Sequence, residues 1–287
     1  MLTKNSGKNI TISNTLKRSI ELTGVSDSPR LDIEIILGYV LGKNRTYLYT
    51  YPDIFLNDSQ YISFNRLLEH RLNGKPIAYI TESREFWSLP LKVSPATIIP
   101  RPETELLVET VLSLSLGEKI SVLDLGTGTG AIALALASEK PFWDITAVDS
   151  ELGALALAQE NRKKFGFGNV SIYLSNWFSS LKEFSFDLIV SNPPYVSLDD
   201  ENLQQGDVRF EPLSALVAEN SGLSDIHTIT FGAYSHLNCG GWLMLEHGCD
   251  QAESVRKFML EAGYHQIKTF SDLSGLDRVS ICRKPNY

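Results

Sequence analysis

The first quarter of the chain carries apolar residues at the spacing of α-helices. Three runs can be followed by their apolar positions: Ile12, Leu16 and Ile20; Leu31, Ile35, Ile36 and Val40; Tyr61, Phe64, Leu68 and Leu72. Gly24, Gly42 and Gly74 fall near the ends of these runs, where helices commonly stop. Asn57 and Asp58 precede the last run, as N-cap residues do. The pattern predicts a small bundle of helices.

From about residue 105 the pattern changes to short β-like runs. They occupy residues 120–125, 144–149, 169–174, 186–191, 241–246 and 278–282. Helical runs, such as 151–164 and 250–262, separate most of them. Strands that alternate with helices predict a mostly parallel, Rossmann-like sheet with helices on both faces, which is an α/β fold.

Residues 86–99 lie between these two patterns and alternate between apolar and polar positions. Their prolines favour an edge ribbon, so a short linking β-hairpin is expected. A chain of 287 residues is long enough for one large domain with a smaller companion. We therefore predict a helical domain at 1–84, a hairpin linker at 85–104 and an α/β domain at 105–287.

Charge is distributed unequally between these parts. The chain holds 26 Lys and Arg against 34 Asp and Glu, a net charge of −8, but residues 1–75 alone hold ten against seven. This asymmetry indicates either a docking surface for an acidic partner or an ordinary solvated face. The acidic balance of the whole chain argues against a general polyanion binder, which needs many contacts from Lys and Arg to phosphates. We expect no stable binding of nucleic acid.

Cysteine usage and hydropathy favour a reducing compartment. Cys239, Cys249 and Cys282 are far apart and form no CxxC pair, so neither a disulfide framework nor a bound metal is expected. His247 lies near Cys249, but no second pair completes a metal site. The amino-terminal residues lack the apolar core of a signal peptide, and no stretch has the ~18 apolar residues of a membrane span. We expect a cytoplasmic protein without membrane contact.

A glycine-rich turn follows the first predicted strand of the α/β domain. The strand ends in Asp124, and the turn leads into an apolar helical run through Gly126, Thr127, Gly128, Thr129 and Gly130. Such a turn lets the backbone approach a ligand closely. Asp149 ends the next strand, where an acid can accept hydrogen bonds from both ribose hydroxyls of an adenosine cofactor. A tight turn that binds no ligand is the alternative.

Two features favour S-adenosylmethionine over a nicotinamide dinucleotide. The spacing GxGxG lacks the final glycine of GxGxxG, because Ala131 and Ile132 follow Gly130. The carboxylate of Asp124 suits the cationic amino-acid end of S-adenosylmethionine and would repel a pyrophosphate. We therefore predict Asp124 as a further cofactor-binding residue.

The most informative segment follows the apolar strand predicted at 186–191 and consists of Asn192, Pro193, Pro194 and Tyr195. Open α/β sheets bind ligands at the carboxyl ends of their strands, where this tetrapeptide lies. Each proline restricts the residue before it, so the loop is stiff. The Asn192 side chain and the Pro193 carbonyl can converge on one NH2 group, with the Tyr195 ring against its flat face. A turn merely braced by proline is the alternative.

This tetrapeptide, with a glycine loop upstream, resembles methyltransferases that modify planar nitrogens: adenine N6, cytosine N4 or glutamine amide N5. Five further segments narrow the resemblance: GKPIAYI (74–80), EFWSLPLKV (85–93), IPRPETELLVE (99–109), SNWFSSL (175–181) and QQGDVRFEPLSALVAENSGL (204–223). Together they closely resemble the bacterial release factor glutamine methyltransferase family, of the PrmC/HemK type. The resemblance implies a class I S-adenosylmethionine-dependent methyltransferase fold with an N-terminal helical domain for substrate recognition.

The activity implied by the resemblance is methylation of a protein. A methyl group would pass from S-adenosylmethionine to the side-chain amide N5 of the glutamine in the GGQ motif of peptide chain release factors 1 and 2, which modulates translation termination. S-adenosylhomocysteine would be the product. A monomer is expected.

The resemblance also implies roles for individual residues. The glycine loop matches the cofactor loop, Asp149 the ribose-binding acid, and Trp177 the residue that packs on adenine. The tetrapeptide matches the glutamine-binding segment, in which Asn192 also borders the cofactor. Catalytic roles fall to Asn192, Pro193 and Tyr195.

Two positions depart from the family pattern. Asn176 stands where the family usually has aspartate, so it would accept a hydrogen bond from the adenine amino group without charge assistance. Glu103 stands where aspartate is common, which is a milder change. Asn176 is still predicted to bind the cofactor.

Other polar or aromatic residues have no assigned role: Glu246 and His247; Arg209, Phe210 and Glu211; Arg101 and Glu103. The first two end a predicted strand and form either an acid–base pair or, as we favour, hydrogen bonds at the rim of the sheet. The three residues of the long loop suit substrate contact. The last pair suits the domain junction.

No strong base lies near the tetrapeptide, so the sequence predicts an in-line displacement that depends mostly on positioning. The Asn192 and Pro193 oxygens would stabilise the positive charge that develops on the NH2 group. The alternative function is adenine-N6 methylation of nucleic acid, because the tetrapeptide is shared. A further alternative is a non-catalytic binding protein on this scaffold, which would not bind the cofactor.

Overall fold

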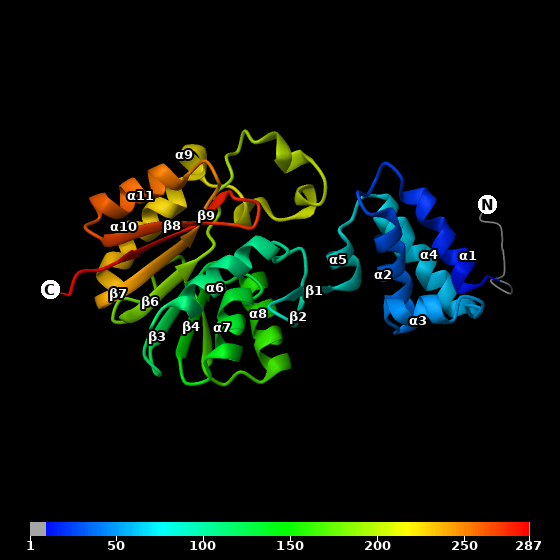
Figure 1. The fold of residues 1–287 in the computed structure, drawn as a ribbon, viewed down its shortest axis with the longest axis horizontal. Coiled ribbons are helices and arrows are strands. Elements are labelled where there is room, and N and C mark those ends of the chain that lie inside the picture. The colour runs from blue at the N-terminus through cyan, green and yellow to red at the C-terminus, as the bar shows by residue number, and fades with distance from the viewer. Residues whose placement is uncertain (1–9, 287) are drawn as a thin grey trace. The chain divides into compact units, whose positions relative to one another are not determined.

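The computed structural model describes residues 10–286 and divides the chain into two compact units (Figure 1). The first unit comprises the residues up to Glu82 together with Gln204–Phe210. The second unit comprises Ser83–Leu203 and Glu211 onward. Each unit has a hydrophobic core of its own.

Helices build the first unit, as the apolar spacing predicts. They are α1 (Ile12–Leu16), the 3-10 helix η1 (Lys17–Leu22), α2 (Pro29–Leu41), α3 (Arg45–Thr50), α4 (Asp58–Leu72) and α5 (Ile77–Thr81). Asn57 caps α4 in a reciprocal capping box with Gln60, and Gly42 ends α2 in the left-handed conformation. Buried side chains from α2 and α4, among them Ile36 and Phe64, fill the core.

A buried arginine holds a distant segment of the chain on this unit. The Arg71 Nε atom of α4 lies 2.7 Å from Asp32 Oδ2 of α2, and Arg71 Nη1 lies 3.1 Å from Asp207 Oδ1. Gly74 has a φ of +85°, and a Cβ there would collide with the Arg209 guanidinium. Close packing therefore explains why Gln204–Phe210 belongs to the helical unit.

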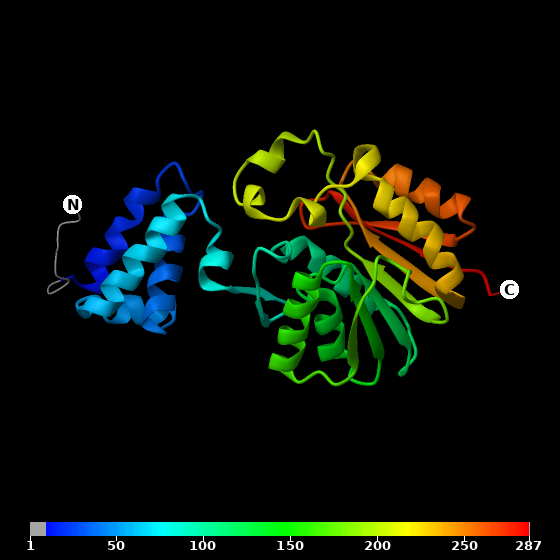
Figure 2. The same cartoon turned by 180° about the vertical axis from the view of Figure 1, so that it is seen from behind.

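A seven-stranded sheet forms the second unit (Figures 1 and 2). Its strands are β3 (Ser121–Leu125), β4 (Asp144–Asp149), β5 (Val170–Leu174), β6 (Phe186–Ser191), β7 (Leu237–Glu246), β8 (His265–Ser271) and β9 (Asp277–Arg283). Their order is β5-β4-β3-β6-β7-β9-β8; β9 pairs antiparallel with β7 and β8, and the other neighbouring strands are parallel. All six strands expected from the sequence are present. The seventh, β8, has a mixed pattern of half-buried and exposed positions that the sequence analysis did not recognise.

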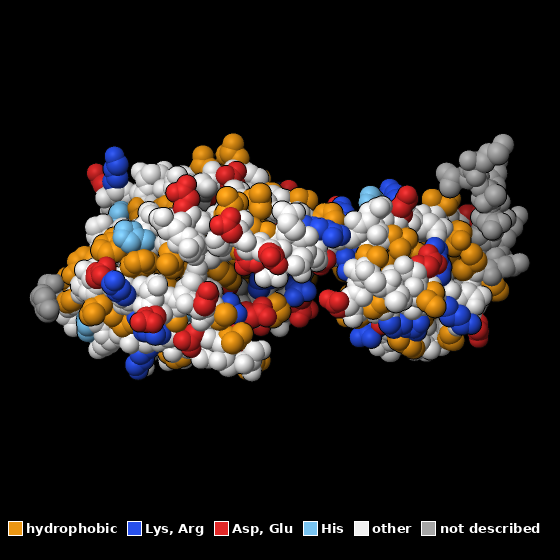
Figure 3. Space-filling model, turned by 90° about the horizontal axis from the view of Figure 1, so that it is seen from above, with side chains coloured by type: hydrophobic (Ala, Val, Ile, Leu, Met, Phe, Trp, Pro, Cys, Tyr) orange, Lys and Arg blue, Asp and Glu red, His pale blue; other side chains and the backbone are white. Residues whose placement is uncertain are grey.

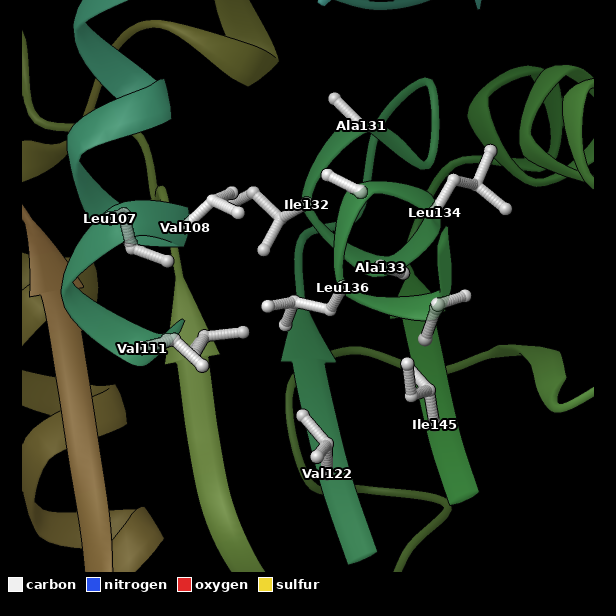
Figure 4. Close-up of a cluster of buried hydrophobic side chains, with 14 of the residues drawn as sticks. Leu107, Val108, Val111, Val122, Ala131, Ile132, Ala133, Leu134, Leu136 and Ile145 are labelled. Carbon is white, nitrogen blue, oxygen red and sulfur yellow. The ribbon is translucent and has the colours of Figure 1, made fainter. Parts of the chain in front are cut away.

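Helices cover both faces of this sheet. One face carries α6 (Glu105–Ser113), α7 (Ala131–Glu139) and α8 (Leu152–Phe165), and the other carries α10 (Ser224–His236) and α11 (Ala252–Glu261), with the short α9 (Glu219–Gly222) before them. Figure 4 shows Leu107 and Val111 of α6 directed toward Leu136 of α7, above Val122 of β3. The next residue of β3, Leu123, packs in the core of the opposite face.

The hairpin consists of β1 (Ser83–Phe86) and β2 (Leu89–Lys92), joined by Trp87 and Ser88, which both have positive φ. Residues 94–104 continue as turns and the 3-10 helix η2 (Pro102–Thr104), because their prolines cannot donate to a strand ladder. Asn161 of α8 accepts a 2.7 Å hydrogen bond from the Lys92 N–H and donates to the Thr129 carbonyl. The hairpin is thus tied to the glycine loop.

None of the helices within residues 10–286 is long and apolar enough to cross a membrane. On the face shown in Figure 3, acidic and basic side chains are interspersed, and several Lys and Arg side chains gather along one edge of the helical unit.

Candidate active site

A cavity of about 240 Å³ lies in the second unit, at the carboxyl edge of the sheet. The register explains its position, because Leu125 lies beside Val148 of β4 and Ser191 of β6. The residues that follow these three strand positions therefore meet at one edge. Seven residues singled out from the sequence line the cavity: Gly126, Gly128, Asp149, Asn176, Trp177, Asn192 and Pro194.

The glycine loop forms the floor between β3 and α7. Gly126, Gly128 and Gly130 have φ values of +70°, +55° and +84°, which a side chain would strain. A Cβ at Gly126 would lie 3.4 Å from Cζ3 of Trp177, so glycine keeps this part of the cavity open. The three glycines therefore suit the backbone conformation of this loop, while Thr127 and Thr129 lie between them.

Asp149 closes one side of the loop. Its Oδ2 atom accepts a 2.9 Å hydrogen bond from the Gly128 N–H, and its Oδ1 atom accepts a 3.0 Å bond from the Glu151 N–H. Burial is the main cause of a raised pKa for this carboxyl group. Asp149 holds the loop and remains on the cavity wall.

Asp124 lies behind the loop and does not line the cavity. Its fully buried side chain accepts a 2.6 Å hydrogen bond from the Thr127 hydroxyl and a 3.2 Å bond from the Ala133 N–H, both at Oδ2. Oδ1 has no hydrogen-bond partner among the described residues. Burial raises the pKa of Asp124 to about 7. Its contacts hold the loop against the start of α7.

Trp177 lies in a tight turn after β5, with a positive φ of 45°. The Ser175 hydroxyl donates a 2.7 Å hydrogen bond to the Trp177 carbonyl and supports this turn. Asp225, in the first turn of α10, lines the same cavity as Trp177 and was not predicted from the sequence. Asn176 lies beside Trp177 on the wall.

Asn192 borders two cavities. It lines the larger one and a neighbouring cavity of about 40 Å³, which Gly126, Thr127, Gly128 and Thr129 also line. Its Nδ2 atom donates a 3.1 Å hydrogen bond to the Thr104 hydroxyl. Asn192 therefore lies on the wall of both the larger cavity and the smaller one.

The rest of the tetrapeptide is less exposed to the cavity. Pro194 lines the larger space, whereas Pro193 and Tyr195 are not part of either lining. The Tyr195 hydroxyl donates a 3.1 Å hydrogen bond to Glu246 Oε1, at the end of β7. Burial is the main cause of a raised pKa for Tyr195, so its hydroxyl stays protonated.

Residues far along the chain brace this tetrapeptide. Gln251 Nε2 donates a 2.9 Å hydrogen bond to the Tyr195 carbonyl, and Val196 forms a β-bridge with Val217. Gly222 has a φ of +81°, and a Cβ there would collide with the Tyr195 carbonyl. Gln251 and Thr104 were not predicted as parts of the site. Gln251 lies outside the quoted motifs, and Thr104 lies within the segment 99–109 without a role of its own there.

The other candidates have structural partners. Arg101 Nη2 lies 2.6 Å from Glu211 Oε2. His247 is fully buried between the Ser280 hydroxyl and the Gly248 carbonyl, each at 2.8 Å, and makes no hydrogen bond with Glu246. Within residues 10–286, no three His, Cys, Asp or Glu side chains are placed to hold a metal ion.

The sheet order and the glycine-loop cavity at the carboxyl ends of β3, β4 and β6 define a Rossmann-like class I methyltransferase. Solved structures agree. The chain resembles a methyltransferase from Pyrococcus furiosus at a TM-score of 0.55 and 19% identity, covering 77% of this chain and 98% of that one. It also resembles the Thermus thermophilus 16S rRNA N2 G1207 methyltransferase (RsmC), solved with AdoMet and guanosine, at a TM-score of 0.51 and 19% identity, covering 70% and 49% of the two chains.

Family models and relatives give the particular family. Residues 16–81 match the PrmC N-terminal domain, and residues 102–208 match the methyltransferase small domain. The release factor glutamine methyltransferase of Aliivibrio fischeri is 51% identical over 95% of this chain and 97% of its own length. The enzyme of that name from Escherichia coli K12 is 49% identical over 93% of this chain and 97% of its own length. The chain belongs to the release factor glutamine methyltransferase family, as its motifs indicate.

Proposed function

We propose that this enzyme transfers a methyl group from S-adenosylmethionine to the side-chain amide nitrogen of the glutamine in the GGQ motif of peptide chain release factors 1 and 2. The observation that carries the proposal is the position of Asn192, which borders both the larger cavity and the smaller one beside the glycine loop. An amide held at Asn192 would lie next to a methyl donor in the larger cavity. The names of the relatives support this acceptor.

The residues of the larger cavity fit S-adenosylmethionine. Gly126 and Gly128 leave room for close approach to the backbone, and Asp149 has acceptor capacity for ribose hydroxyls. Trp177 would pack on adenine, with Asn176 and Asp225 within the same wall. When bound, S-adenosylmethionine supplies a methyl group that the amide nitrogen takes from the sulfonium while losing a proton, which leaves S-adenosylhomocysteine.

The chain itself contributes orientation and electrostatic stabilisation. An amide nitrogen is a poor nucleophile because its lone pair is delocalised into the carbonyl. The Asn192 side-chain oxygen and the Pro193 carbonyl would each accept one N–H of the acceptor, which fixes the amide and stabilises positive charge as it develops. Tyr195, which lines neither cavity, would hold the tetrapeptide in place through the bond from its hydroxyl to Glu246. Asp124 would act from behind the loop by holding its shape.

We further propose that the helical unit recognises the protein acceptor and that the enzyme acts as a monomer in the cytoplasm. The helical unit has its own core and a mild excess of basic residues, several of which gather along one edge in Figure 3. These features suit a docking surface for an acidic region of a protein.

Incubation of a purified release factor with this enzyme and S-adenosylmethionine should add one methyl group. Peptide mass spectrometry should place that group on the GGQ glutamine. Free DNA and RNA, tested in parallel without a protein acceptor, should remain unmethylated. Methylation of adenine in those controls, with an unmodified release factor, would favour the nucleic-acid alternative instead.

Replacement of Asp149 by alanine should weaken the binding of S-adenosylmethionine by about 2–3 kcal/mol, because hydrogen bonds to a charged group are lost. Isothermal titration calorimetry measures this directly. Asp144, exposed at the opposite end of the same strand, offers a matched control, and Asp144→Ala should leave the affinity unchanged. Equal affinities of the two variants would contradict the ribose assignment.

A further inference from the structure

The smaller cavity beside the glycine loop carries a positive charge that the larger one lacks. Of the described residues that line the two cavities, Arg101 is the only lysine or arginine, and it lines the smaller one. Three acidic residues line the larger cavity: Asp149, Glu151 and Asp225. Arginine is the side chain best suited to bind a carboxylate. The smaller cavity therefore suits an anionic group.

Arg101 is held in place but keeps donors for a second partner. Its Nη2 atom lies 2.6 Å from Glu211 Oε2, and its side chain is 30% exposed, whereas that of Glu211 is fully buried. A guanidinium has five N–H donors in a fixed fork. The bond to Glu211 is the one that Arg101 makes within the described part of the chain. Glu211 therefore orients the fork, and the remaining N–H groups can bind another acceptor.

A buried hydroxyl of the glycine loop belongs to the same cavity. Thr129 is only 4% exposed and lines the smaller cavity. Its carbonyl accepts a hydrogen bond from Asn161, but its hydroxyl has no hydrogen-bond partner among the described residues. Thr127, by contrast, donates its hydroxyl proton to Asp124. A hydroxyl left without a partner at this depth is costly, so an acceptor that enters the cavity would stabilise it.

The start of α7 adds backbone donors to this cavity. Ala131 and Ile132, the first two residues of the helix, belong to its lining (Figure 4). The N-cap of this nine-residue helix is Gly130, which has no side chain to cap it. The first N–H groups of a helix have no partner within it and favour a negative group. They act here together with Arg101 and Thr129.

We propose that the smaller cavity binds the α-carboxylate of the methionine part of S-adenosylmethionine, with Arg101 as its charge partner and the Thr129 hydroxyl as a further donor. The inference rests on the proposed function, which takes S-adenosylmethionine as the methyl donor. Four residues line both cavities: Ile98, Gly126, Gly128 and Asn192. The two cavities are therefore neighbours, as the two ends of one cofactor require.

This assignment also fits the position of Asn192. In S-adenosylmethionine the sulfonium lies between the ribose and the methionine carboxylate. With the ribose at Asp149 and the carboxylate at Arg101, the sulfonium belongs between the two cavities, and Asn192 lies on the wall of both. The sequence analysis gave the amino-acid end of the cofactor to Asp124, but that side chain lies behind the loop. The charged side chain at this end is Arg101 instead.

The test is calorimetry with S-adenosylmethionine and with decarboxylated S-adenosylmethionine, which lacks only the carboxylate. The wild-type enzyme should bind S-adenosylmethionine about 10- to 100-fold more tightly, the range for hydrogen bonds to a charged group. Arg101→Gln should weaken the binding of S-adenosylmethionine by a similar factor and that of the decarboxylated form by less than about threefold, so that the preference disappears. Arg101→Lys keeps the charge but not the fork, and should retain part of the preference.

Three further variants separate this role from that of a structural clamp. Glu211→Gln removes the ion pair but keeps Arg101, so the preference for S-adenosylmethionine should remain. Thr129→Val keeps the size of the side chain and should reduce the preference by less than Arg101→Gln does, because only a neutral donor is lost. Lys119→Gln removes an exposed positive charge at the opposite end of β3 and should leave both affinities unchanged.

Equal affinity of the wild-type enzyme for the two ligands would overturn the inference. So would an equal loss of affinity for both ligands in Arg101→Gln, because a residue that only holds the loop does not distinguish them. If Arg101→Gln does not fold, Arg101→Lys and Thr129→Val decide the question, and an unchanged preference in both would refute the assignment. Failure of the wild-type enzyme to bind either ligand would instead refute the proposed function.

Discussion

Replacement of Asn192 by alanine should lower kcat/KM for a release factor by roughly 10²–10³, the effect of losing one preorganised contact to the transition state. The variant removes the oxygen that would accept from the acceptor amide. It should leave the affinity for S-adenosylmethionine nearly unchanged, because Gly126, Gly128, Asp149 and Trp177 form the rest of the larger cavity. Steady-state kinetics with a release factor and calorimetry with the cofactor separate these two effects.

Asn192→Asp makes the test sharper. Aspartate keeps the size and an acceptor oxygen, but it cannot donate to Thr104 as Asn192 Nδ2 does at 3.1 Å. It also brings a second negative charge toward Glu246. We therefore expect the aspartate variant to be no more active than the alanine variant. The matched control is Asn202→Ala, an exposed asparagine of the following loop, which should keep full activity. Full activity in Asn192→Ala would show that the tetrapeptide is only a brace.

Replacement of Arg71 by alanine should destabilise the helical unit by about 3–5 kcal/mol, because it leaves a buried charge without its partner. The Arg71 and Asp32 side chains are only 8% and 6% exposed, and their closest atoms are 2.7 Å apart. All four tryptophans lie in the second unit, so fluorescence would not report on this change. Amide hydrogen exchange of α2 and α4 measures it, and residues 204–210 should exchange faster as well.

Arg45 provides the control for this second prediction. It also pairs with a fully buried carboxylate, Glu34, but its own side chain is 62% exposed. Glu34 keeps Arg30 and Tyr49 as partners when Arg45 is removed. Arg45→Ala should therefore cost about 1 kcal/mol or less. Equal exchange rates in the two variants would show that burial of the Arg71 pair does not matter.

Local patterns in the sequence were enough to predict the main helices of the first unit and six of the seven strands of the sheet. In the first quarter, the helical runs and the glycines near their ends correspond to α1, α2 and α4. Six apolar runs correspond to strands of the sheet. These predictions succeed because a helix or strand buries one of its faces, and the residues of that face recur at a fixed spacing along the chain. β8 was missed because none of its side chains is fully buried, so its sequence, HQIKTFS, has too few apolar residues to mark a strand.

The sequence by itself also determined where the glycine loop and the tetrapeptide lie in the sheet. Both follow directly after strands of a parallel sheet. Their position in sequence alone therefore places them at the carboxyl edge of that sheet. Gly126, Asp149 and Asn192 meet on the cavity wall for this reason. Positive φ at the loop glycines is a conformation that glycine adopts without strain.

Only the tertiary structure decided which distant side chains support that site. Thr104 and Glu246 are far apart in sequence, yet Thr104 bonds to Asn192 and Glu246 bonds to Tyr195. Asp225 lines the same cavity as Trp177. Asp124, which looked like a cofactor ligand from its position beside the loop, is directed inward to Thr127. A hydrogen bond depends on distance and direction in space, and these arise from how strands and helices pack. No spacing along the chain encodes them, so they became visible only in the folded molecule.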